Sequence, residues 1–206
     1  AGRLPNLLLN YLTTWQSNGA WAVPVVVYGN RSYGNALVEL YDILRYRGFH
    51  PIAAAAFVGQ HSFTTRLATG RPDREDLEKA EQFSAEIVRR ILQPGEFTGI
   101  KIPGQGAPDY GGYYKPKGRD EEVVNFLKAK PVTTDACIDC RRCAKVCPMG
   151  AIRLDHPSEV SGICIKCNAC VKQCPVHAKQ LTDEAYLSHV GFLENRYTSR
   201  ARIELF

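Results

Sequence analysis

The chain carries two matching stretches, CIDCRRCAKVCP at residues 137–148 and CIKCNACVKQCP at residues 164–175. In each stretch the four cysteines are separated by two, two and three residues, and a proline follows the fourth. The second stretch repeats the first at an offset of 27 residues, and together they contain all 8 cysteines of the 206-residue chain. The sequence therefore predicts a duplicated half-module with approximate two-fold symmetry.

The spacing suits the ligation of iron–sulfur clusters. Three cysteines at two-residue intervals can wrap a tight loop around a 4Fe-4S cube, and the longer step followed by proline carries the chain away. The pattern resembles that of bacterial two-cluster ferredoxins, in which the fourth cysteine of each run ligates the other cluster. The resemblance implies two 4Fe-4S clusters, one held by Cys137, Cys140, Cys143 and Cys174, and the other by Cys164, Cys167, Cys170 and Cys147.

Two other uses of cysteine compete with this interpretation. A disulfide framework is typical of short secreted chains, and three thiols this close together do not pair cleanly. Paired zinc sites also use Cys-x2-Cys elements, but four ligands saturate one zinc ion, so the third cysteine and the Cys-Pro step would have no role. Both alternatives explain less of the pattern than clusters do.

The composition indicates a globular protein without a membrane or nucleic-acid function. The longest apolar stretch, residues 20–28, is interrupted by Pro24 and is too short to span a bilayer. The net charge of +5 comes from scattered basic residues, which does not indicate a nucleic-acid surface. Thiolates that must stay reduced for ligation favour a cytoplasmic location.

The first part of the chain reads as alternating strands and helices. Two buried strands are expected at residues 23–28 and 52–58, joined by a helix that ends at Gly48, which makes a parallel βαβ unit. A further helix is expected from Pro72 to Pro94. Two strands do not make a self-sufficient α/β sheet, and the only methionine is Met149, so we expect the chain to be truncated at its N-terminus.

The loop Gly29-Asn30-Arg31-Ser32-Tyr33-Gly34, which follows a strand and opens a helix, is similar to the fourth-strand loop of flavodoxin-like proteins. The stretch AGRLPN at residues 1–6 is similar to their third-strand loop. With the cysteine module downstream, the chain resembles the flavodoxin–ferredoxin fusion proteins, or ferrodoxins. This resemblance implies an α/β flavodoxin-like domain with a partial parallel sheet, followed by a small α+β dicluster ferredoxin module.

The resemblance also implies flavin mononucleotide (FMN) as a possible cofactor of the first domain. Ala1, Gly2 and Arg3 would border one side of the isoalloxazine ring. The other side would be bordered by Gly29, Asn30, Arg31 and Tyr33. Nothing in the sequence matches the phosphate-binding loop that follows the first strand in flavodoxins.

We expect four regions along the chain. They are a partial flavodoxin-like domain (1–94), a Gly/Pro-rich linker with a short helix near residues 121–130 (95–126), a ferredoxin domain (127–185) and a C-terminal helix and tail (186–206).

The function expected from these features is electron transfer between redox partner proteins, through two 4Fe-4S clusters fused to a flavodoxin-like domain. An electron carrier is favoured over an enzyme. Two alternatives remain, a ferredoxin with a cofactor-free docking scaffold and an oxidoreductase that uses flavin to reduce a small acceptor. The sequence predicts no catalytic residues and leaves the oligomeric state open.

Overall fold

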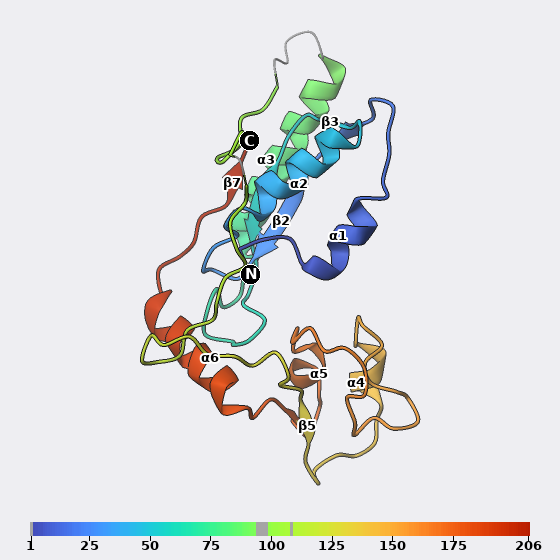
Figure 1. Ribbon diagram of the computed structural model, residues 1–206, viewed down its shortest axis with the longest axis vertical. Helices are drawn as coiled ribbons and strands as arrows, with labels where there is room; N and C mark the ends of the chain where they lie inside the picture. Colours follow the sequence, from blue (N-terminus) through green and yellow to red (C-terminus); the bar gives the residue numbers. More distant parts are fainter. Residues whose placement is uncertain (1, 94–98, 108) are drawn as a thin grey trace. The chain divides into compact units, whose positions relative to one another are not determined.

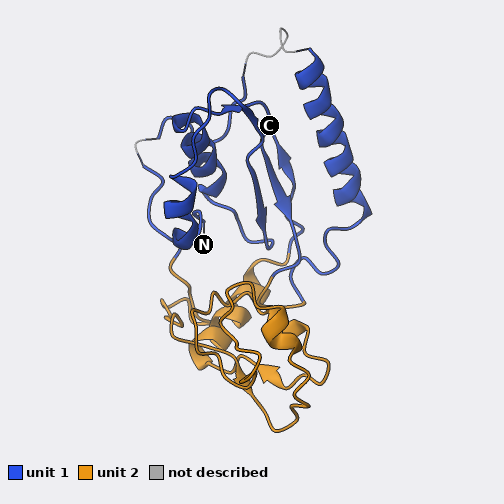
Figure 2. Ribbon diagram, turned by 90° about the vertical axis from the view of Figure 1, so that its right-hand side faces the viewer, with its two compact units in different colours: residues 1–61, 66–114, 199–206 blue, residues 62–65, 115–198 orange. Residues whose placement is uncertain are grey.

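The computed structural model describes residues 2–93, 99–107 and 109–206. It divides the chain into two compact units, shown in different colours in Figure 2. Unit 1 comprises residues 1–61, 66–114 and 199–206, and unit 2 comprises residues 62–65 and 115–198. Both units are therefore built from segments that are distant in sequence. Residues 62–65 belong to unit 2, although they lie within the first domain expected from the sequence.

Unit 1 contains the parallel strand pair that the sequence predicts. Strand β2 (Val25–Tyr28) pairs in parallel with β4 (Ala55–Val58), with Val26 opposite Ala56. Short strands β1 (Trp21–Ala22) and β3 (His50–Pro51) pair in the same direction just upstream. Helix α2 (Ala36–Tyr46) follows β2 and leads to β3, and α1 (Asn6–Leu12) precedes all four strands (Figure 1).

The alanine-rich segment before and within β4 lies between two helices. Ala54 and Ala56 pack against Leu37, Val38 and Tyr41 of α2. Ala53 and Ala55, which alternate with them, pack instead with Phe83 of α3 (Arg74–Leu92). All four alanines are fully buried, because their small side chains let a helix approach each face of the sheet. Figure 2 shows the strands of unit 1 between α3 and the other helices.

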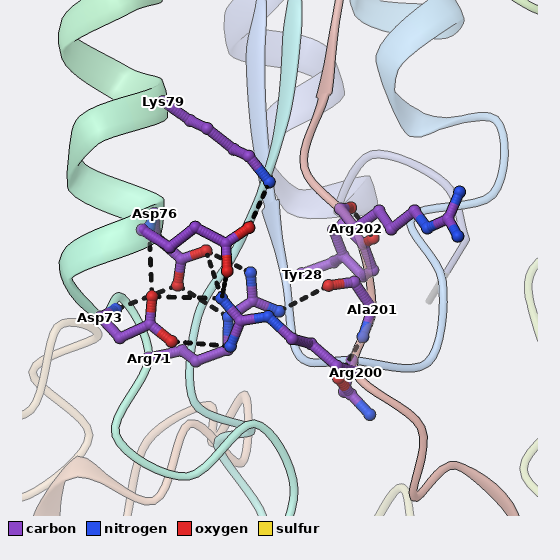
Figure 3. A network of polar contacts seen from close by, with 10 residues as sticks. Tyr28, Arg71, Asp73, Asp76, Lys79, Arg200, Ala201 and Arg202 are labelled. Atoms are coloured by element: carbon purple, nitrogen blue, oxygen red, sulfur yellow. Dashed lines mark hydrogen bonds and ion pairs between the residues drawn. The ribbon is translucent and has the colours of Figure 1, made fainter.

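The sheet has a third strand that the sequence analysis did not predict. Strand β7 (Glu204–Leu205) pairs antiparallel with β4 on the side away from β2, with Leu205 opposite Ala55. The segment leading to β7 also lies against the start of α3, where Arg200 forms ion pairs with Asp73 and Glu75 (Figure 3).

A buried ion pair anchors the start of α3. Arg71, only 6 % exposed, donates from Nε to Asp76 Oδ2 at 2.7 Å and from Nη1 to the carbonyl oxygen of Ala201 at 2.6 Å. Asp73 and Asp76 form a reciprocal capping box at the first turn of the helix. Hydrogen bonds from Arg71 hold the pKa of Asp76 below its usual value. The C-terminal segment is thus joined to α3 through charges, as Figure 3 shows.

Unit 2 is built of short elements around the cysteine stretches. It contains β5 (Val132–Thr133), α4 (Arg142–Lys145), α5 (Ala169–Lys172), β6 (Lys179–Gln180) and α6 (Glu184–Arg196). Strands β5 and β6 pair antiparallel, with Thr133 opposite Lys179, so the start of the first half-module lies beside the end of the second. An aromatic cluster of Phe63, Phe126 and Tyr186 packs under α6.

The prediction of a short helix at residues 121–130 is wrong. Glu121 has a left-handed backbone with φ of 62°, and Val123 instead forms a bridge with Lys117. Phe126 then turns into the aromatic cluster, so tertiary packing overrides the local helical preference. Parts of the expected flavin border and linker lie outside the described residues. They are Ala1, residues 94–98 and Pro108.

Among the described residues, no helix is long and apolar enough to cross a membrane.

Candidate metal centre

The two half-modules repeat their backbone conformation as well as their cysteines. Asp139 and Arg141 have φ of 53° and 59°, and the residues 27 positions later, Lys166 and Asn168, have φ of 56° and 59°. Non-glycine residues rarely adopt this left-handed conformation. Here it curls each cysteine loop tightly before α4 and α5, which carry Cys143 and Cys170.

The loops enclose two cavities. The first cavity is lined by Cys137, Cys140, Cys143 and Cys174. The second cavity is lined by Cys147, Cys164, Cys167 and Cys170. Each cavity therefore brings together three cysteines of one stretch and the fourth cysteine of the other.

The fourth cysteine of each stretch has the same hydrogen bond. The backbone N–H of Ala151 donates to Cys147 Sγ at 3.3 Å, and the N–H of Ala178 donates to Cys174 Sγ at 3.2 Å. Although burial acts in the opposite direction, N–H groups of residues 176–179 hold the pKa of Cys174 below its usual value. Hydrogen bonds of this kind stabilise a thiolate, which is the form that ligates metal.

Two other cysteines lie in surroundings that disfavour an isolated thiolate. Burial, with the neighbouring thiols of Cys164 and Cys167, raises the pKa of Cys170 to about 11. Burial also raises the pKa of Cys143, against the opposing effect of the Lys179 ammonium. Ionised sulfur at these positions needs a compensating positive charge, which the irons of a bound cluster supply.

The donor set of each cavity fits a cluster. Within the described residues, no three or more His, Cys, Asp or Glu side chains form a site for a metal ion as the side chains stand. Each cavity is lined by four thiols, and sulfur-only ligation is the chemistry of 4Fe-4S cubes.

The linings of the cavities differ in charge. Arg141, Arg142 and Lys179 line the first cavity. The second cavity is lined, apart from its cysteines, by Asn168 and apolar residues such as Ile152 and Val160. Lys179 was not predicted from the sequence. An alignment of the two half-modules at their 27-residue offset shows that Lys179 occupies the position equivalent to Ile152.

The residues expected to border a flavin lie close together in unit 1. A Cβ atom at Gly34 would lie 2.5 Å from the carbonyl oxygen of Gly2, so the loops at residues 2–3 and 29–34 touch through their backbones. A Cβ atom at Gly29 would lie 2.7 Å from the ring of His61. The structure therefore brings the loops at residues 2–3 and 29–34 together.

The side chains of these loops are bonded within the chain. Arg3 pairs with Glu39, and Tyr33 donates its hydroxyl to Glu204 Oε2 at 2.9 Å. Asn30 donates to the carbonyl oxygen of Ser199 and accepts from the N–H of Ala201. The guanidinium of Arg31 lies 3.8 Å from the ring centre of Tyr114. Segment 199–204 thus bonds to Asn30 and Tyr33, and Tyr114 contacts Arg31.

Comparison with protein families identifies the cysteine region only. Residues 136–178 match the family model of the 4Fe-4S dicluster domain. No curated protein matches the chain. The matched segment spans all eight cysteines and ends one residue before Lys179. The match supports a ferredoxin-type module in this part of the chain and an iron–sulfur electron-transfer role.

Proposed function

We propose that the protein is an electron carrier with two 4Fe-4S clusters, one in each cavity. The observation that supports this most strongly is the grouping of the eight cysteines into two sets of four, each with one cysteine from the other stretch. Bound clusters would supply one-electron chemistry, and the thiolates would hold them.

The surroundings of the cavities fit this function. Apolar residues line both cavities beside the cysteines, among them Ile138 in the first cavity and Ile165 in the second. Exposed Arg141 and Arg142 border the first cavity, and their positive charge would attract an acidic face of a redox partner protein.

Flavin binding by unit 1 is a second candidate, taken from the resemblance to ferrodoxins. One observation favours it: Arg31 Nη2 is buried and has no hydrogen-bond partner among the described residues. The engagement of Arg3, Asn30 and Tyr33 within the chain favours instead a cofactor-free docking scaffold. We therefore propose the scaffold for unit 1.

Electron counting tests the function. Anaerobically purified holoprotein titrated with dithionite should take up about two electrons per chain, one per cluster, and pass them to an oxidised one-electron acceptor protein. A matched control in which Cys140 and Cys167 are both replaced by alanine should take up none. Uptake of electrons by that control, or none by the loaded protein, would contradict the proposal. Flavin released by acid from the same preparation would contradict the cofactor-free scaffold.

A further inference from the structure

The 27-residue repeat places chemically different side chains at equivalent positions of the two cavities. Lys179 and Thr133 line the first cavity, and their counterparts in the second are Ile152 and Val160. Other equivalent pairs keep the same character, among them Ile138 with Ile165 and Pro175 with Pro148. The two cavities thus have similar backbone conformations, but the first has a polar pair, buried Lys179 and half-buried Thr133, where the second has apolar residues.

Lys179 is a buried cation without an acidic partner. It is 2 % exposed, and its ammonium group donates to the Thr133 hydroxyl and to the Ser158 carbonyl oxygen at 2.9 Å. Both acceptors are neutral, and no Asp or Glu in the described part of the chain pairs with it. Burying an ammonium group in this way is unfavourable unless negative charge lies nearby.

The missing negative charge is what a cluster would bring. A 4Fe-4S cube with four thiolates is an anion whose charge becomes more negative by one on reduction. A cation beside it stabilises the reduced form and makes the potential less negative, whereas an apolar lining does the opposite. Lys179 lines the first cavity, and Ile152 takes its place in the second.

We propose that Lys179 makes the reduction potentials of the two clusters unequal. The cluster in the first cavity is reduced first, and the cluster in the second cavity takes up the second electron. This inference rests on the proposed cluster function. Each step takes one electron from an external one-electron donor, which is oxidised as one cluster is reduced, with no bond made or broken. The reduced cluster in the second cavity is then the stronger reductant of the two.

The test is a redox titration of the full-length holoprotein, followed by electron paramagnetic resonance. The wild type should show two reduction steps whose equilibrium constants differ by roughly tenfold or more, about 59 mV for one-electron couples. Lys179→Gln keeps hydrogen-bond donors but removes the charge. It should therefore shift the step at the less negative potential to a more negative potential, by a similar amount of about 59 mV. Lys179→Arg, which keeps the charge, should retain two separate steps.

Lys145→Gln is the matched control, because it removes the same charge from an exposed position in α4 between Cys143 and Cys147. It should move the step at the less negative potential much less than Lys179→Gln does. If Lys179→Gln does not assemble clusters, Lys179→Met takes its place, since the equivalent Ile152 shows that an aliphatic side chain fits there.

Failure of this inference and failure of the proposed function give different results. A protein without iron and labile sulfide refutes the function itself. A fully loaded wild type that titrates in one step, or a charge-free Lys179 variant that keeps the wild-type separation, leaves the function standing and overturns the role of Lys179.

Discussion

Cys147 and Cys174 are the residues on which the arrangement of the metal centre depends. Each follows the other three cysteines of its own stretch by a step of three residues, yet each lines the cavity of the other stretch. Their sulfur atoms accept equivalent backbone hydrogen bonds, from Ala151 and Ala178. The two half-modules are therefore mutually dependent, since each completes the other's site.

Pairs of substitutions test this crossed arrangement. We expect Cys140→Ala with Cys174→Ala to remove one cluster and leave about four irons per chain, because both residues line the first cavity. Cys167→Ala with Cys174→Ala should remove both clusters, because these residues line different cavities. Iron analysis of the two purified double variants measures the difference, and the reverse pattern would show that each stretch holds its own cluster.

Lys179 shows where residue-level reasoning from the sequence falls short. The grouping of the cysteines in the two cavities could be predicted, because it depends on their spacing along the chain. A lysine, by contrast, is expected on the surface unless it is paired, and nothing local to Lys179 indicates its burial. Only its pairing opposite Thr133 across β5 and β6 places it against the first cavity.

Among the elements, those with strong local patterns were predicted and those that depend on distant contacts were not. The parallel pairing of the strands near residues 23–28 and 52–58 was predicted correctly, and β4 is buried as expected. The expected burial of the first strand is wrong, because Val25 and Val27 of β2 alternate with half-buried residues and are exposed. Strand β7 has two residues, and its position depends on β4 and on the contacts of Arg200 with α3, about 125 residues away in sequence. No periodic pattern of apolar residues in the sequence could indicate strand β7.

The start of helix α3 joins these distant segments, so Arg71 should contribute strongly to the stability of unit 1. We expect Arg71→Leu to lower its free energy of unfolding by about 3 kcal/mol, because Asp76 loses its buried partner. The control Arg74→Leu breaks only an exposed pair with Glu78 and should cost about 0.5 kcal/mol or less.

Denaturant unfolding followed by tryptophan fluorescence measures this effect separately for unit 1, because both tryptophans of the chain, Trp15 and Trp21, belong to it. Equal midpoints for the Arg71 and Arg74 variants would contradict the importance of the buried pair.

At the scale of the whole molecule, the chain divides into two units whose borders differ from those that composition suggests. Tyr110 and Tyr113, expected in a linker, contact Asp42 and the carbonyl oxygen of Leu4 within unit 1. Residues 62–65 belong to unit 2, where Phe63 packs against Phe126 and Tyr186. A Gly/Pro-rich composition indicates irregular backbone, but it does not tell which unit that backbone covers.

A count of metal and sulfide is the most direct test of whether this molecule holds two 4Fe-4S clusters. Protein purified without oxygen should contain about eight irons and about eight acid-labile sulfides per chain. About two zinc ions per chain without labile sulfide would contradict the presence of clusters.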